Sequence, residues 1–149
     1  PGILWRLYLL RTWMRKNRES IARLWRAGEP VATTASAIAG VDQAPTEDDI
    51  AHTADSILAG AFTGDFAVAL ERAAAFTDVV ALGLRIEARN IIARLKAAEG
   101  SDSSDSGISA MEKQVRTKSS RLMHTAGNLF VTAKDFRHGA NLWRRGKLE

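Results

Sequence analysis

Cysteine is absent from this chain of 149 residues. Its absence excludes disulfide bonds, thiolate zinc sites, iron–sulfur clusters and a cysteine nucleophile. It is also typical of proteins kept in a reducing compartment, so we expect an intracellular, cytoplasmic protein. The chain starts with Pro1 and Gly2 rather than with a methionine, which suggests a processed product or an excised domain.

Long apolar runs and strand patterns are missing as well. The best apolar run, Ile3–Leu10, is interrupted by Arg6, and it falls far short of the roughly 20 residues that span a membrane. No stretch alternates cleanly between apolar and polar residues, as a half-buried strand would. Only three prolines occur, and two of them, Pro30 and Pro45, stand where helical patterns break.

What the sequence does contain is helical periodicity in an ordinary globular composition. Apolar residues make up 46% of the chain and charged residues 26%, both close to the averages of globular proteins. The apolar residues recur at spacings of three and four over long stretches, which is the pattern of helices with one buried face. We therefore predict an all-α helical bundle, with residues 1–149 forming a single domain.

The predicted bundle is built on a long antiparallel helix hairpin. Helices are expected over about 65–99 and 109–143, joined by a flexible loop at 100–107 that contains only Gly, Ser and Asp. A short loop between two long helices favours an antiparallel pair. Apolar residues cover a wide face of the first long helix, so it should contact several neighbours, and Gly83 is the expected position of a bend.

Three further helices complete the prediction. An N-terminal amphipathic helix is expected over about 3–27, where Gly28 and Pro30 end it. Two short helices should follow, over about 31–39 and 46–60. Thr46 is a suitable N-cap for the second of them, because its hydroxyl can accept a hydrogen bond from a free backbone N–H.

Charge is segregated along the chain. Residues 1–27 carry a net charge of +6, residues 28–112 carry −9 and residues 113–149 carry +7. In one interpretation the basic ends lie against the acidic middle, and the charges form a mutually screened surface. In the other, the two ends form a basic surface that attracts a polyanion or an acidic partner. The sign pattern alone does not separate the two.

All four tryptophans lie in the basic terminal segments, three of them in Leu-Trp-Arg triplets. A tryptophan beside an arginine can anchor a protein interface or stack on a base; the ordinary alternative is a half-buried tryptophan on a bundle helix. Trp5 and Trp13 stand off the main apolar row of their helix, which favours an exposed or partner-covered role, whereas Trp143 continues such a row. The candidate partner-binding residues are Trp5, Trp13, Trp25 and Trp143.

The candidate polyanion-binding residues are cations of the first and last helices. They would contact phosphates of nucleic acid, with an affinity that falls steeply with salt. A helix-turn-helix can be drawn over residues 19–40, but its second helix lacks base-reading side chains. The full set is Arg6, Arg11, Arg15, Lys16, Arg18, Arg23, Arg26, Arg116, Lys118, Arg121, Arg144, Arg145 and Lys147.

Motifs of catalysis are not found. The three histidines make no metal-binding pair, and no phosphate-cradling glycine loop or nucleophile elbow occurs. Asp49, His52 and Asp55 share one helix face at spacings of three and could hold a divalent ion, although an exposed acidic helix usually has this pattern. We therefore expect a protein that is not an enzyme and holds no cofactor and no metal.

The expected function is that of a non-catalytic assembly or interaction module, which docks onto a protein partner or forms a homo-oligomer. The long apolar rows and the terminal tryptophans motivate this expectation. The first alternative is binding of nucleic acid or another polyanion through the basic terminal helices. The second is peripheral attachment to a membrane surface through the N-terminal helix, which is basic and carries tryptophans.

Overall fold

The computed structural model describes residues 2–41, 44–99 and 105–147. Every regular element among these residues is helical, which confirms the predicted all-α fold. In chain order the elements are α1 (Gly2–Lys16), α2 (Arg18–Gly28), the short 3-10 helix η1 (Glu29–Val31), α3 (Thr33–Ala39), α4 (Glu47–Thr63), α5 (Phe66–Glu99) and α6 (Asp105–Arg144).

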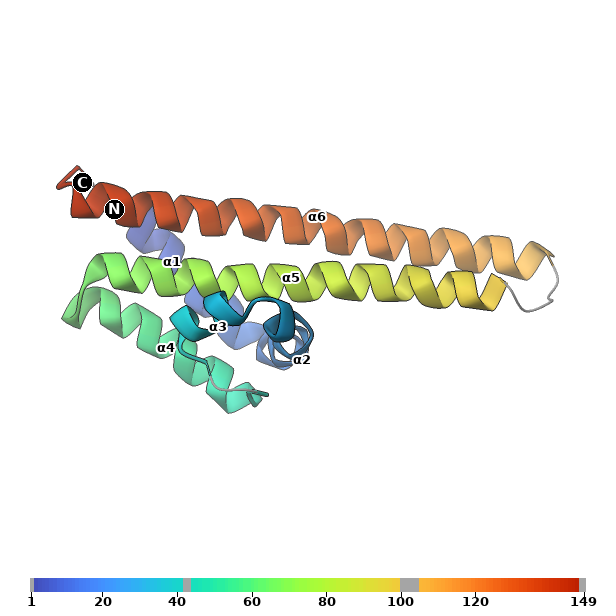
Figure 1. Cartoon of the computed structure of the whole chain (residues 1–149), viewed down its shortest axis with the longest axis horizontal. Coiled ribbons are helices and arrows are strands. Elements are labelled where there is room, and N and C mark those ends of the chain that lie inside the picture. The colour runs from blue at the N-terminus through green and yellow to red at the C-terminus, as the bar shows by residue number, and fades with distance from the viewer. Residues whose placement is uncertain (1, 42–43, 100–104, 148–149) are drawn as a thin grey trace.

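The predicted antiparallel hairpin of long helices is also present. α5 has 34 residues and α6 has 40, lengths of roughly 50 and 60 Å at 1.5 Å per residue. The two helices run side by side in opposite directions, and both chain ends lie at the same end of the hairpin (Figure 1). This pair is the axis on which the other helices are arranged.

The hairpin has two halves with different surroundings. Helices α1 to α4 cover only the half that carries the chain ends, with α1 behind α5 and α3 in front of it in the view of Figure 1. We call this half the body. Its largest buried side chains are Trp25, Phe76 and Phe136. In the other half, α5 and α6 have only each other as neighbours, and Leu95 is the only side chain described after Ala88 on α5 that is buried.

The single N-terminal helix predicted over 3–27 is wrong, because the chain breaks at Asn17 into α1 and α2. Asn17 has φ −109° and ψ 22°, outside the helical region. Its side-chain Nδ2 donates to the carbonyl oxygen of Trp13 at 2.9 Å, and its backbone N–H donates to the same oxygen at 3.0 Å. An asparagine side chain competes in this way with helical hydrogen bonds.

Glycines bring α2 and α5 into backbone contact inside the body. A Cβ atom added to Gly83 would lie 2.1 Å from the carbonyl oxygen of Leu24, and one added to Gly28 would lie 2.3 Å from that of Val79. Only glycine allows such an approach. Gly83, where the sequence suggested a bend, therefore serves as a helix contact inside an uninterrupted α5.

The predicted helix ends differ in detail from those observed. Thr46 caps α4 as expected, and its hydroxyl accepts from the backbone N–H of Asp49 at 3.2 Å. The last helix starts at Asp105, so residues 105–107 of the predicted loop are helical, and residues 100–104 lie outside the described residues. Asp and Ser are favoured at helix starts, which accounts for the earlier beginning.

Candidate functional site

Trp25 is a core residue and not a surface residue. Its exposed fraction is 0%, and its ring packs against Phe76 with ring centroids 5.0 Å apart. Trp25 continues the buried row of α2 with Ile21 and Leu24. This removes Trp25 from the candidate partner-binding residues, because a fully buried side chain offers no area to a partner.

The other three tryptophans reach the surface to different degrees. Trp5 is 63% exposed and Trp143 is 47% exposed. Trp13 is half-buried. Together with Leu9 and Leu129 it lines a shallow groove of about 370 Å³ between α1 and α6. These positions leave Trp5 and Trp143 as accessible anchors and Trp13 as the wall of a groove.

The exposed aromatic side chains gather where several helices end. The Tyr8 ring of α1 and the Phe62 ring of α4 have centroids 6.3 Å apart, and both side chains are exposed. Trp143 of α6 meets Phe66 of α5 edge-on with centroids 4.8 Å apart. The first contact joins α1 to α4 and the second joins α5 to α6, so these aromatic side chains take part in packing between helices.

A glycine on α6 shows that the ends of three helices meet there. A Cβ atom at Gly139 would lie 3.4 Å from side-chain atoms of both Ile3 and Leu70. The start of α1, the start of α5 and the last part of α6 therefore lie together, and the turn from α4 to α5 is at the same end (Figure 1). We call the exposed apolar side chains of this end the aromatic end: Trp5, Tyr8, Leu9, Phe62, Val68 and Trp143.

Sequence reasoning missed four members of the aromatic end: Tyr8, Leu9, Phe62 and Val68. A signal for two of them was present, since Tyr8 and Leu9 stand beside the buried row of Leu7, Leu10 and Met14. Phe62 escaped notice because the short helix was expected to end at Gly60, whereas α4 continues to Thr63.

Most of the candidate polyanion-binding arginines are engaged in ion pairs. Seven ion pairs occur among the described residues, and six of them join a basic terminal segment to the acidic middle of the chain. The pairs are Arg6–Asp135, Arg11–Asp55, Arg15–Asp55, Arg23–Glu87, Arg116–Glu112, Arg137–Asp78 and Arg144–Glu71. This pattern is the one expected from charge complementarity within the fold.

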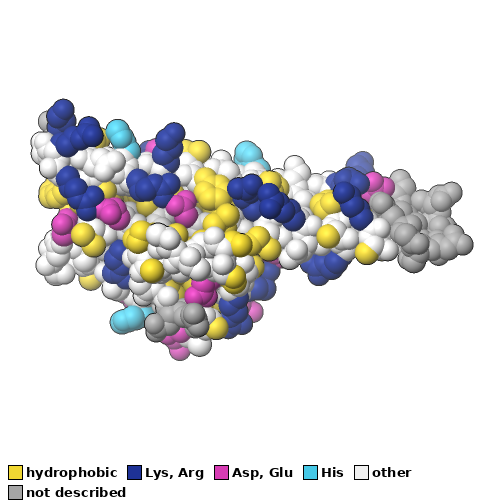
Figure 2. Space-filling view, in the orientation of Figure 1, with side chains coloured by type: hydrophobic (Ala, Val, Ile, Leu, Met, Phe, Trp, Pro, Cys, Tyr) yellow, Lys and Arg dark blue, Asp and Glu magenta, His cyan; other side chains and the backbone are white. Residues whose placement is uncertain are grey.

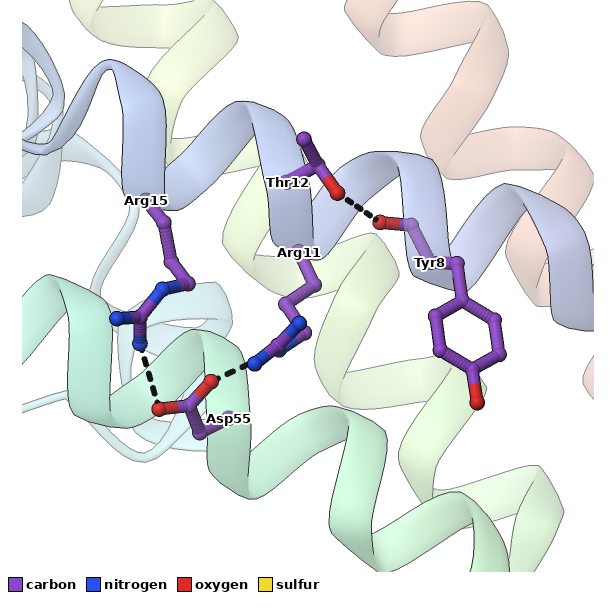
Figure 3. Close-up of polar contacts among 5 residues, drawn as sticks. All are labelled: Tyr8, Arg11, Thr12, Arg15 and Asp55. Atoms are coloured by element: carbon purple, nitrogen blue, oxygen red, sulfur yellow. Dashed lines mark hydrogen bonds and ion pairs between the residues drawn. The ribbon is translucent and has the colours of Figure 1, made fainter.

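Asp55 is the clearest example of this pairing. Arg11 and Arg15, one turn apart on α1, both point at Asp55 of α4, at 2.8 and 2.7 Å (Figure 3). The hydrogen bond from Arg11 and the charges of both arginines lower the pKa of the Asp55 carboxyl below its ordinary value. Asp55 thus links α1 to α4. Asp49, His52 and Asp55 do not form a metal-binding cluster, since the described residues contain no group of three metal-ligating side chains.

The remaining candidate cations are widely spread. Lys16, Arg18 and Arg26 belong to α1 and α2, whereas Lys118 and Arg121 lie on the half of α6 that projects from the body. Arg145 and Lys147 follow the other end of α6. Lys118 and Arg145 are roughly 40 Å apart along the helix axis. The structure therefore does not bring the predicted terminal cations to one surface.

A group of cations that includes the predicted Arg116, Lys118 and Arg121 does come together, on the projecting half of the hairpin. We call residues 85–98 of α5 and 110–121 of α6 the basic arm. It contains eight Lys and Arg residues against two glutamates, Glu87 and Glu112. Four of these cations were counted in the acidic middle of the sequence: Arg85, Arg89, Arg94 and Lys96. Figure 2 shows dark blue side chains along this part of the molecule and little magenta.

The hollow that Arg26 and Glu29 line carries no recognisable catalytic arrangement. It has a volume of about 700 Å³ and lies beside α2, η1 and α3. Its lining contains one cation, Arg26, and one carboxylate, Glu29, and no histidine. General acid–base catalysis needs a titratable pair held within reach of one substrate atom, and these lining residues do not provide one.

Comparisons with protein families, with curated proteins and with solved structures found no match to this chain. No helix among the described residues is long and apolar enough to cross a membrane. Two surfaces distinguish this molecule, the aromatic end and the basic arm.

Proposed function

We propose that this protein is a non-catalytic helical assembly module that docks onto a protein partner through its aromatic end. One observation carries the proposal. All four aromatic side chains that are exposed in the fold, Trp5, Tyr8, Phe62 and Trp143, lie at this one end. Tryptophan and tyrosine are enriched among the residues that contribute most to binding energy at protein interfaces.

The shape of the aromatic end supports docking onto another protein. The groove beside Trp13 is lined by apolar residues and by the ion pair of Arg6 with Asp135. Protein interfaces combine apolar anchors with a polar rim in this manner. The partner that can be tested directly is a second copy of the chain, because an identical surface can pack against itself about a two-fold axis.

The two competing interpretations use the same terminal segments and fit the fold less well. The terminal arginines are mostly ion-paired, so fewer of them are left for phosphates. A membrane-surface helix inserts its main apolar row into the lipid. The main row of α1, Leu7, Leu10 and Met14, is already buried in the body.

Sedimentation velocity and light scattering across a concentration series test the proposal. We expect wild type to self-associate and Trp5→Ser with Phe62→Ser to remain monomeric, because loss of two interface aromatics costs about 2 kcal/mol each. The two losses sum to about 4 kcal/mol, so the double variant should weaken association by about 700-fold. Its thermal stability should stay near wild type, since both side chains are exposed.

The matched control replaces two exposed apolar side chains away from the aromatic end. Val31→Ser with Ile38→Ser changes residues that are 68% and 48% exposed near and on α3. This control should associate as wild type does. A wild type that remains monomeric at about 100 μM would overturn docking between copies, since the free energy of association would then be weaker than about −5.5 kcal/mol. An equal loss of self-association in both double variants would indicate non-specific hydrophobic association instead of a defined docking site.

A further inference from the structure

The basic arm carries charge that the fold does not neutralise. Of its two glutamates, Glu87 is paired with Arg23 of α2, and Glu112 is paired with Arg116. No other carboxylate pairs with a cation of the arm among the described residues. In the body, by contrast, Arg11 and Arg15 of α1 are both ion-paired with Asp55 of α4. The arm therefore presents a positive potential to solvent.

Several of these cations share one face of the arm. Arg89 and Lys96 of α5 line a shallow groove of about 430 Å³, opposite Ser119 and Met123 of α6. Arg85 stands one helical turn before Arg89, so it lies on the same side of α5. Its guanidinium is 5.7 Å from the centre of the Phe130 ring, a contact that orients the group without cancelling its charge.

The same face continues over α6. Arg116, Lys113 and Arg121 surround a second hollow of about 610 Å³, which also includes the hydroxyl-bearing Thr117 and Ser120. Arg116 precedes Ser119 by three positions and Met123 by seven, which places it beside the groove of α5. The side chains of Lys113, Arg116 and Arg121 are all exposed. The strip thus contains six cations and one carboxylate: Arg85, Arg89, Lys96, Lys113, Arg116 and Arg121, with Glu112.

We propose that this strip of the basic arm binds double-stranded nucleic acid through its phosphate backbone. This function is separate from the protein docking proposed for the aromatic end. Lys and Arg side chains that neutralise phosphates release condensed counterions, and this release supplies most of the affinity of sequence-independent binding. The strip runs for roughly 20 Å along α5, a length at which a duplex carries about a dozen phosphate charges.

The composition of the arm favours a duplex over other polyanionic partners. Single strands are held by aromatic side chains that stack on bases, and residues 85–98 and 110–121 contain no aromatic residue. A membrane-surface helix would need aromatic as well as large apolar side chains facing outward. The exposed aromatic side chains lie at the opposite end of the molecule, and Met111 is the one large apolar side chain that the described residues of the arm expose. The six cations of the strip are suited to phosphates, and contacts to phosphates carry no sequence information.

The test is fluorescence anisotropy of the full chain with labelled 20-base-pair DNA duplexes of two unrelated sequences. We expect equal affinity for both sequences, since the contacts are to phosphates. With six phosphate contacts the affinity should fall by about a thousandfold between roughly 50 and 200 mM salt. A single strand of the same length should bind more weakly, because the arm offers no stacking platform.

Two variants with the same change of charge locate the site. Arg89→Gln with Lys96→Gln removes two cations of the strip, and it should weaken duplex binding about tenfold or more and reduce the salt slope by about two. Lys16→Gln with Arg145→Gln removes two cations outside the arm and should bind as wild type does. All four side chains are exposed, and thermal melts will confirm that both variants are folded.

Three results would overturn the proposal. The first is no binding of either duplex at about 50 mM salt, where phosphate contacts are strongest. The second is a loss of affinity in the Lys16 and Arg145 variant with none in the Arg89 and Lys96 variant, which would place the site on the terminal helices. The third is flotation with vesicles of phosphatidylcholine and phosphatidylserine in the absence of duplex binding, which would assign the arm to a membrane surface.

Discussion

The two ends of this molecule are built from the same pair of helices and expose different chemistry. At the aromatic end, α5 and α6 are joined by α1 and α4, and the exposed apolar side chains include Trp5, Phe62 and Trp143. At the start of the basic arm Arg23 of α2 pairs with Glu87, and beyond it α5 and α6 run with only each other beside them (Figure 1). The exposed side chains of the arm include seven Lys and Arg residues and no aromatic residue. The number of neighbouring helices accounts for part of this difference.

A two-helix arm can bury only one narrow seam. Its buried side chains are small or few, namely Ala88, Leu95 and Ser119, and large apolar residues elsewhere on its surface would remain in water at a cost. Four helices meeting at the other end can bury most apolar residues. Aromatic side chains that stay exposed at this end, beside a core that could have held them, are therefore best explained by contact with a partner.

Charge pairing differs in the same way. The body contains the acidic helix α4 and the first half of α5, so cations of α1 and α6 find carboxylates such as Asp55, Glu71 and Asp78. The arm has few carboxylates, and its cations are left for solvent or a ligand. Net charge counted along the sequence hid this contrast, because Arg89 and Lys96 fall in the acidic segment.

The largest expected effect tests whether the body is held together by close backbone packing. Gly83→Ala would place a methyl group 2.1 Å from the carbonyl oxygen of Leu24, so α2 must move away from α5. Overpacking of this kind costs about 3 kcal/mol. Urea denaturation should show this loss of stability, and the fluorescence of buried Trp25 should change as its contact with Phe76 loosens.

The matched control is Gly127→Ala on the exposed side of α6. A Cβ atom there meets no atom within 4 Å, so the substitution should raise stability by about 0.5–1 kcal/mol through helix propensity alone. If both variants were equally stable, the close contact of α2 with α5 would not hold the body together.

A second effect, of intermediate size, sharpens the description of the arm. Ser119 is buried there, and its hydroxyl donates to the carbonyl oxygen of Ala88 at 3.1 Å, which joins α6 to α5. Ser119→Ala removes that bond, and Ser120→Ala changes an exposed neighbour with the same gain in helix propensity. The first variant should be less stable than the second by about 1 kcal/mol. Equal melting temperatures would mean that the bond contributes nothing to the arm.

The smallest effect concerns pH and tests charge pairing in the body. The lowered pKa of Asp55 means that the folded state binds the proton less tightly than the unfolded chain does. The stabilisation is therefore complete above the ordinary pKa of about 3.9, and it is lost as the pH falls through the lower folded value. Asp55→Asn should cost up to about 1 kcal/mol at pH 7, the range of exposed ion pairs, and nothing near pH 2.

A companion variant separates this pair from other carboxylates. Arg11→Gln with Arg15→Gln removes both partners of Asp55, and it should abolish the further effect of Asp55→Asn at pH 7. A cost for Asp55→Asn that does not change with pH in the wild-type background would show that the carboxylate charge is not what stabilises the contact of α1 with α4.

Much of the fold followed from local patterns that the chain carries in its sequence. Apolar spacing predicted the start of α5 at residue 65, and the helix starts at Phe66. Asp65 caps it there, since its carboxylate accepts a hydrogen bond from the backbone N–H of Ala67 at 2.8 Å. The break at Asn17 was missed because asparagine can also stand inside a continuous helix. The hydrogen bond from the Asn17 side chain to the carbonyl oxygen of Trp13, which accompanies the break, is seen only in the structure.

The sites were less predictable than the helices. Tryptophans could be named from the sequence, but burial separated Trp25 from Trp5, and burial depends on which helices cover a position. The sequence pointed to three of the eight cations of the basic arm, Arg116, Lys118 and Arg121, but not to Lys113 or to the four on α5. Arg89 and Arg116 are far apart along the chain and belong to the same half of the molecule only because the hairpin folds α6 back along α5.

The sequence by itself determined that this chain is helical, where its long helices lie and that its tryptophans and basic residues concentrate toward the ends. These properties depend on spacing and propensity, which act over a few residues. Only the tertiary structure decided which tryptophan is buried, which arginines find carboxylates and which cations stand together on the arm. Those outcomes depend on contacts between residues distant in the chain, and such contacts form only when the helices pack.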